Sequence, residues 1–283
     1  MRHLFGATAA LCLSAPAFAQ SAPPAATLPS PEELASRDTV TLAVGGAAVP
    51  DYEGSDDYRL IPAAAIRGKV SGISFITRGT YLYVDVLPTG AKMDFDVGPI
   101  VGARFSSRRH IKDDIVKLLP NRKTTFEAGG FAGVSFHGLT NPYDTLGLRL
   151  DVLHGLGSDR NWTNFSPNVE FSTPLSRATY VSASVGAEWA ANKYADYYFT
   201  ISPADSLRTG GVLPPFNAGG GLKNWKLGLL LNQSLGGNLL HGFSLFGAGQ
   251  YSRLLGDFRR SPIVSQRGSA GQWLGAAGLA YTW

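Results

Sequence analysis

Aromatic residues recur ten positions apart in three stretches of this chain: Phe95 and Phe105, Phe126 and Phe136, Trp273 and Trp283. Side chains alternate between the two faces of a β-strand, so an even separation puts both rings on one face. A strand of about ten residues that is tilted by about 40 to 45° spans roughly 25 Å, which is the height of the apolar band between the two aromatic girdles of a transmembrane β-barrel. The spacing therefore predicts strands that cross a membrane.

The N-terminal residues have the pattern of a secretory signal. Arg2 and His3 precede an apolar run over residues 4–18, and Ala17-Phe18-Ala19 is an A-x-A cleavage site. We therefore expect residues 1–19 to be a signal peptide that is removed on export. The only cysteine, Cys12, lies in this leader, so the exported chain has no thiol for a disulfide, a metal or a nucleophile.

The exported chain divides into a short tail and one long domain. Residues 20–38 are rich in proline, alanine and serine, which predicts a mobile periplasmic tail or spacer. Residues 39–283 are long enough for a single closed barrel, and 34 glycines, 15 phenylalanines and 11 tyrosines are typical of antiparallel β structure. After the leader no run of about 18 apolar residues predicts a membrane helix. The net charge of +4 is small and scattered, which argues against a nucleic-acid partner.

Apolar residues alternate with small or polar ones along the predicted strands. In residues 181–189, valine, alanine and tryptophan alternate with serine, glycine and glutamate. A soluble sandwich also alternates, but its polar face usually carries more charge. We therefore expect the polar face to line the lumen of a barrel. The charged residues with this inward parity are Arg104, Glu127, Arg149, Asp151, Glu188 and Lys226.

The alternation predicts an all-β, antiparallel up-and-down barrel of about twelve strands. The expected strands are 39–49, 58–67, 71–77, 80–86, 92–105, 124–136, 144–156, 161–173, 178–190, 222–235, 242–254 and 271–283. Residues 71–86 are taken as two short strands around Arg78-Gly79, and ten strands is the alternative count. With the N-terminus in the periplasm, the long connections fall on the outer side and the short ones on the periplasmic side, as in outer-membrane barrels.

The last strand ends on an aromatic residue. Leu279, Tyr281 and Trp283 occupy every second position, which looks like the C-terminal signal by which bacterial outer-membrane barrels are recognised for insertion. The barrel assembly machinery is then an expected partner, together with the lipid and lipopolysaccharide of the outer membrane of a Gram-negative bacterium.

Three segments of the chain carry distinct motifs. The first is a P-x-Y-x-G-S-x-x-Y element, and the others are a Tyr-Phe tract and a late Ser-Pro loop. Their residues are Pro50, Tyr52, Gly54, Ser55, Tyr58, Tyr198, Phe199, Ser261 and Pro262. Together these segments resemble the MltA-interacting protein (MipA)/OmpV family of outer-membrane proteins. The chain departs from the family at Phe258-Arg259-Arg260, where smaller or acidic residues are expected. The resemblance implies an outer-membrane barrel. Some family members are described as scaffolds that link a murein lytic transglycosylase to a murein synthase, and others as antigens or adhesins.

The sequence predicts no catalysis and no cofactor. His110 with Asp113 and Asp114 is the one candidate acid–base group, and basic residues surround it, so a charged surface loop is the better interpretation. The acidic cluster of Asp51, Glu53, Asp56 and Asp57 lacks the spacing of an EF-hand and is interpreted as a solvated loop.

Three roles remain open at this level. A scaffold in the cell envelope is the first. A small-solute pore is the second, although the mixed signs of the inward charges favour ion pairs that plug the lumen. A surface adhesin or antigen that acts through extracellular loops is the third, with the tyrosine-rich loop 191–221 as its binding surface.

Overall fold

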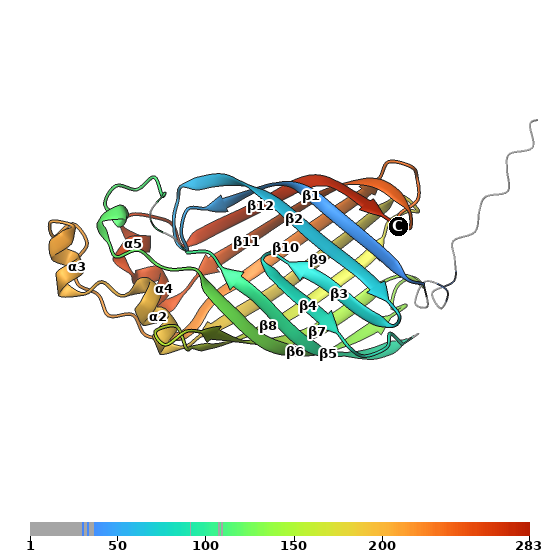
Figure 1. Ribbon diagram of the computed structural model, residues 1–283, viewed down its shortest axis with the longest axis horizontal. Helices are drawn as coiled ribbons and strands as arrows, with labels where there is room; N and C mark the ends of the chain where they lie inside the picture. Colours follow the sequence, from blue (N-terminus) through green and yellow to red (C-terminus); the bar gives the residue numbers. More distant parts are fainter. Residues whose placement is uncertain (1–29, 31–32, 34–36, 91, 107, 109) are drawn as a thin grey trace, which may run out of the picture.

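Antiparallel strands close into one barrel in the computed structural model, which describes residues 30, 33, 37–90, 92–106, 108 and 110–283 (Figure 1). Within these residues twelve strands are present. They are β1 Thr39–Pro50, β2 Tyr58–Val70, β3 Ile73–Arg78, β4 Tyr81–Asp85, β5 Met93–Arg104, β6 Thr125–His137, β7 Thr145–Leu156, β8 Thr163–Pro174, β9 Thr179–Ala190, β10 Gly221–Ser234, β11 Gly242–Leu254 and β12 Gly271–Thr282. The predicted signal peptide and nearly all of the predicted tail lie outside the described residues.

Each strand pairs with its neighbours in sequence, and β12 pairs with β1 to close the barrel. The predicted fold class and the count of twelve are confirmed. The short β3–β4 hairpin around Gly79 is also present, with Arg78 opposite Tyr81. The remaining differences are shifts of a few residues at strand ends, where the alternation pattern carries little information.

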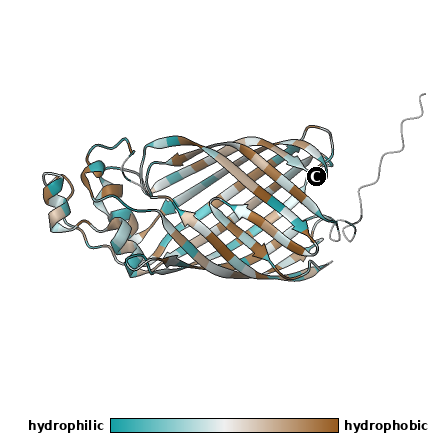
Figure 2. Cartoon of the chain, viewed as in Figure 1, coloured by the Kyte–Doolittle hydropathy of each residue, from teal (hydrophilic) through white to brown (hydrophobic). Residues whose placement is uncertain are grey.

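The outward face of the barrel is apolar. Outward side chains such as Phe126, Leu229 and Trp273 are 64%, 62% and 61% exposed. Figure 2 shows brown, hydrophobic segments distributed along the barrel strands. Contiguous exposed apolar surface of this extent is unfavourable in water, so the outer wall faces lipid. Among the described residues, no helix has the length and apolar character needed to cross a membrane.

The two ends of the barrel differ. β1 begins and β12 ends at one end, which we name the terminal end; its strand connections are short. The opposite end, which we name the helical end, carries short helices in long connections (Figure 1), five of them within the described residues. They are η1 Val116–Leu118, α2 Asn192–Phe199, α3 Pro203–Arg208, α4 Gly256–Arg260 and α5 Pro262–Ser265.

A buried carboxylate organises the turn between β6 and β7 at the terminal end. Asp144 is 1% exposed and accepts hydrogen bonds from the backbone N–H groups of Leu139, Thr140 and Asn141 and from the Thr140 hydroxyl, at 2.5 to 3.1 Å. Burial alone would raise the pKa of Asp144, but these hydrogen bonds outweigh it and lower the pKa to about 2.

This depressed pKa predicts a pH-dependent contribution to stability. Because an unfolded aspartate titrates near pH 4, the contribution is complete above about pH 5 and is lost as pH falls toward 2. Asp144→Asn should lower the free energy of unfolding by about 1 to 2 kcal/mol at pH 7. The difference from wild type should shrink below about pH 4. Urea unfolding of both proteins at pH 7, 4 and 2.5 measures this, and a difference that is independent of pH would contradict it.

Candidate functional site

The mouth of the barrel at the helical end is filled by a hydrophobic core, which we name the cap. Its largest members are Trp162, Tyr194, Phe199 and Phe258, each at most 2% exposed. The rings of Trp162 and Tyr194 meet edge to face at 5.3 Å, and those of Phe199 and Phe258 do so at 5.1 Å. The long connections therefore pack inward over the strands, and the tyrosines of loop 191–221 expected at the surface are largely buried.

The loop after β1 is fastened to the last long connection. The Tyr52 hydroxyl donates to the carbonyl oxygens of Ile263 and Arg267, at 3.1 and 2.9 Å. Burial raises the pKa of Tyr52, which keeps this hydroxyl protonated. Gly54 has a φ of 99°, and a Cβ there would lie 2.4 Å from Val264 Cγ2. Glycine is thus required at this position for both its backbone conformation and its size.

The other family-like segments meet in the same place. The Ser261 hydroxyl donates to the Phe199 carbonyl at 2.5 Å, and Pro262 begins α5 within the buried core. The Tyr198 hydroxyl lies 3.4 Å from Ser106 Oγ and 3.3 Å from Thr125 Oγ1. Residues that are far apart in the sequence therefore form one interlocked cap. Pro50 ends β1 and Tyr58 begins β2, so both border the cap. Ser55 is buried, and its carbonyl oxygen accepts from the Gln272 side-chain amide.

A charged network lies directly beneath the cap and is centred on Lys223, which is 1% exposed. Its Nζ lies 2.8 Å from Glu53 Oε1 and 2.9 Å from Glu188 Oε1. The Tyr194 hydroxyl accepts from Lys223 Nζ and from Arg104 Nη1, both at 3.2 Å, and donates to Glu53 at 2.5 Å. Burial raises the pKa of Tyr194 well above its ordinary value. The cap and the strands are thus joined through one phenol.

Glu127 extends this network across the lumen. It accepts from Arg104 Nε at 3.2 Å, from Trp162 Nε1 at 3.0 Å and from the Tyr81 hydroxyl at 2.5 Å. A second cluster lies nearer the terminal end, and it joins Arg149 to Asp151 and Arg78 to Glu170, each at 2.6 Å. The charged residues of both clusters are therefore matched with opposite charges, and the ion pairs Arg104–Glu188 and Arg78–Glu170 cross the lumen beneath the cap.

The six inward charges expected from parity all face the lumen, but they differ in their partners. Arg104, Glu127 and Glu188 meet in the upper network, and Arg149 pairs with Asp151. Within the described part of the chain, no hydrogen bond or ion pair involves Lys226. The two-residue alternation does not predict that Lys223 faces the lumen, because a β-bulge between Leu222 and Asn224 turns this extra residue inward. Nor does it predict that Glu53 joins the network, since Glu53 had been assigned to a solvated loop.

The candidate acid–base group does not assemble. Asp113 binds Arg267 at 2.8 Å, Asp114 pairs with Lys117 at 2.9 Å, and His110 is exposed. The Lys117 ammonium lowers the pKa of Asp114. In the described ranges no group of three or more histidine, cysteine or acidic side chains could hold a metal ion.

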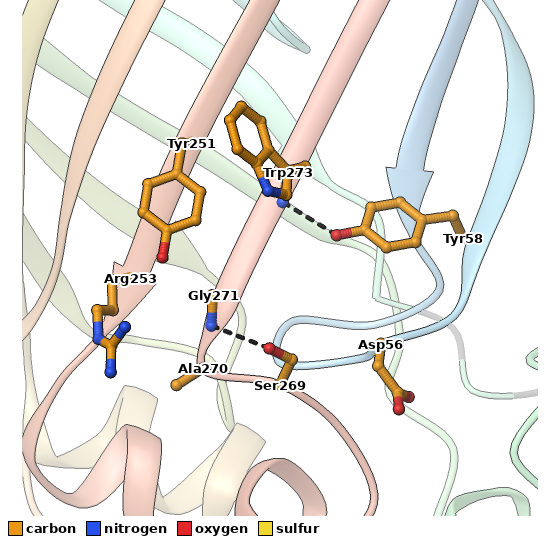
Figure 3. A pocket seen from close by; sticks show the side chains of 8 residues that line it. All are labelled: Asp56, Tyr58, Tyr251, Arg253, Ser269, Ala270, Gly271 and Trp273. Atoms are coloured by element: carbon orange, nitrogen blue, oxygen red, sulfur yellow. Dashed lines mark hydrogen bonds between the residues drawn. The ribbon is translucent and has the colours of Figure 1, made fainter.

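An open pocket of about 520 Å³ lies on the outer surface at the helical end (Figure 3). The Tyr251 and Trp273 rings stand 4.9 Å apart beside it, and the Tyr58 hydroxyl accepts from the backbone N–H of Trp273 at 3.0 Å. Arg253 and Asp56 lie at its edges. Aromatic rings next to charged side chains are typical of the boundary between the apolar band and the lipid headgroups.

The C-terminal residues form an aromatic cluster on the outward face. The Tyr281 ring meets those of Phe243 and Trp283 edge to face, with ring centres 4.7 Å apart in both pairs. Leu279 is 46% exposed on the same face, and the Trp283 N–H donates to the Val40 carbonyl at 2.9 Å. The last strand is therefore paired to its end at the seam where the barrel closes.

Known proteins resemble this chain to different degrees. A search of curated proteins found no match. An outer membrane channel from Pseudomonas putida F1 is similar with a TM-score of 0.46 and 9% identity, over 91% of this chain and 97% of that one. The outer membrane protein OprD from Pseudomonas aeruginosa has a TM-score of 0.36 and 9% identity, over 86% of this chain and 65% of that one. The family model described as "MltA-interacting protein MipA" matches residues 42–283. This outer-membrane barrel protein therefore belongs to the MltA-interacting protein MipA family.

Proposed function

We propose that this protein is a non-conducting, non-enzymatic scaffold of the outer membrane that binds a murein transglycosylase of the MltA type at its periplasmic end. The sealed mouth of the barrel carries this proposal. Side chains of the cap that are at most 2% exposed fill the helical end, and beneath them the ion pairs Arg104–Glu188 and Arg78–Glu170 join strands on different sides of the lumen. A solute pore would need an open path along this axis.

Orientation follows from the connections. Outer-membrane barrels have short periplasmic turns and longer extracellular loops, so the terminal end faces the periplasm and the cap faces outward. Residues 1–19 would serve as the cleaved signal peptide. In this orientation the pocket beside Tyr251 and Arg253 lies at the outer leaflet, where it would meet lipopolysaccharide.

The periplasmic end offers an apolar surface to a protein partner. Leu139, Leu175 and Leu235 lie on three successive terminal-end turns and are 54%, 65% and 58% exposed. Exposed apolar residues that recur at one end of a molecule are typical of binding surfaces. The family name supplies the transglycosylase as the partner, and a murein synthase is the second partner that the scaffold role implies.

Binding of a purified MltA-type transglycosylase to the full chain in detergent, measured by biolayer interferometry, tests the proposal. Wild type should bind, and serine at all three leucines should weaken binding about tenfold, since each buried leucine contributes roughly 1 kcal/mol or less at a partly exposed interface. Leu207→Ser is the matched control because Leu207 is 81% exposed at the opposite end. No binding by wild type, or equal binding by the triple variant, would refute the assigned surface.

An adhesin is the second candidate role. The tyrosines of loop 191–221 do not favour it, because Tyr194 and Tyr198 are buried. Its support comes from α3, which projects beyond the rest of the cap (Figure 1) and exposes Leu207.

A further inference from the structure

The wall of the barrel is interrupted between β2 and the β3–β4 hairpin. β2 pairs with β1 along its whole length, from Tyr58 to Lys69. On its other side β2 pairs with β3 only over residues 67–70, and the hairpin then turns back at Gly79 (Figure 1). Among the described residues, none continues this backbone ladder beside residues 58–65.

Three features prevent this edge from pairing with another strand. The Thr77 hydroxyl takes the place of a backbone partner, because it accepts from the Ile66 N–H at 2.9 Å and lies 3.3 Å from the Ile66 carbonyl oxygen. Lys112 Nζ donates to the Tyr58 carbonyl at 2.8 Å. Residues of the same parity direct their backbone groups to the same side, so Pro62 stands at the free edge without an N–H. Proline and lysine are recognised means of blocking strand addition.

The inner surface beside the interruption is uncharged. Between Arg59 and Arg67, the inward residues of β2 are Ile61, Ala63 and Ala65. The same rows continue across three neighbouring strands, with Ser244 as their polar member. They contain Ala43, Gly45 and Ala47 of β1, Ala276, Gly278 and Ala280 of β12, and Ser244, Phe246 and Ala248 of β11. Leu274 faces inward one row nearer the helical end, opposite Gln250. The ion pairs of the lumen lie on the other strands. The lumen therefore has a charged half and an apolar half.

Space remains in front of the apolar half. Ile61 and Leu274 face inward, yet each is 37% exposed, and Ala65 is exposed as well. Apolar side chains that face water inside a barrel are unfavourable by about 25 cal/mol per Å². A hydrocarbon in this space would remove that cost.

We propose that the interruption is a lateral opening through which the acyl chain of a membrane lipid enters the barrel and lies against the apolar half of the lumen. Residues 58–65 extend roughly 23 Å along the strand, or about 17 Å across the membrane at a tilt near 40°, starting from the girdle at Tyr58. The opening thus lies within the apolar band. Leu60, 83% exposed on the outward face, joins it to the lipid-facing wall.

A lipid enters such an opening with its headgroup left at the interface. The backbone groups of β2 that face the free edge, such as those of Leu60 and Ala64, line the opening, where water in the lumen satisfies them. The acyl chain meets only apolar side chains beyond Leu60. The cap closes the barrel above the chain, so this route connects the lumen with the membrane rather than with the outside solution.

Photocrosslinking tests this opening. The full chain is reconstituted in vesicles of phosphatidylcholine that carries a diazirine at the end of one acyl chain, and the adducts are mapped by mass spectrometry after irradiation. We expect adducts at inward Ile61 or Leu274 in addition to outward Leu229. Adducts that are confined to outward residues would overturn the proposal. This wild-type map is decisive on its own, and it is independent of transglycosylase binding.

A pair of variants then localises the entry. Ala63→Trp puts a large ring on the inward face at the opening and should reduce inward adducts at least fivefold, with adducts at Leu229 unchanged. Ala64→Trp is the matched control, because the neighbouring side chain points to lipid. Folding of both is verified by the gel shift on boiling. Equal loss of inward adducts in both variants would place the entry elsewhere and overturn the assignment.

Discussion

Lys223→Met is expected to lower the free energy of unfolding by about 3 to 5 kcal/mol, the cost of removing one partner from a buried ion pair. Lys223 Nζ lies 2.8 Å from Glu53 and 2.9 Å from Glu188. Without it, the nearest cation to Glu188 is Arg104, at 3.7 Å. Methionine has similar length but no charge, so buried Glu188 and half-buried Glu53 would both lose their shared cation. Urea unfolding of the refolded protein in detergent micelles measures the change.

Lys226→Met is the matched control. Lys226 lies three residues further along the same strand and also faces the lumen, but within the described residues it has no hydrogen bond or ion pair. Its loss should change the free energy of unfolding by about 1 kcal/mol or less. Adding Glu53→Gln and Glu188→Gln to Lys223→Met should recover part of the stability, because the uncompensated charges are then removed. Equal effects of the two lysine variants would show that Lys223 does not hold the network together.

The alternation of side chains along the strands was enough to predict the barrel and the lumen position of six charged residues, although not that of Lys223. The alternation of residues 181–189 predicts β9 and the lumen position of Glu188, because a two-residue period depends only on local backbone geometry. Alternation also predicts the short β3–β4 hairpin once the chain is required to have an even number of strands. These features are encoded in residues that are neighbours in sequence.

The cap and its network could not be predicted in this way. By the two-residue alternation alone, Lys223 would face the lipid. It faces the lumen because a bulge follows Leu222, and the sequence gives no sign of that bulge. Glu53 and Tyr194 come from loops 141 residues apart, and only the path of both loops over the mouth of the barrel brings them to a 2.5 Å hydrogen bond. Family resemblance did mark Tyr52, Gly54 and Ser261, yet it gave no sign that they pack together. Long-range packing of loops leaves no periodic trace in the sequence.

Removing the part of the cap between β9 and β10 is expected to convert a silent barrel into a conducting one. Ala190 and Gly221 are directly paired, so an Asn-Gly turn can replace residues 191–220 without disturbing the hairpin. The deletion removes Tyr194 and Phe199, which are fully buried, and with them the phenol that joins Lys223, Arg104 and Glu53. Water then reaches a lumen lined by charged side chains, and steady single-channel steps should appear in planar bilayers.

A smaller deletion in the same loop tests whether the buried cap residues, rather than any part of the loop, close the lumen. Replacing residues 203–212 with a short glycine-serine linker removes α3 and exposed Leu207 but keeps buried Ile201 and Leu213. The bridge between Ile201 and Phe216 can then still form, so this variant should stay silent like wild type. Wild-type conductance equal to that of the larger deletion would contradict a sealed mouth. Silence of all three proteins would show that the ion pairs beneath the cap close the lumen by themselves, because Arg104 of β5 reaches Glu188 of β9 and Arg78 of β3 reaches Glu170 of β8.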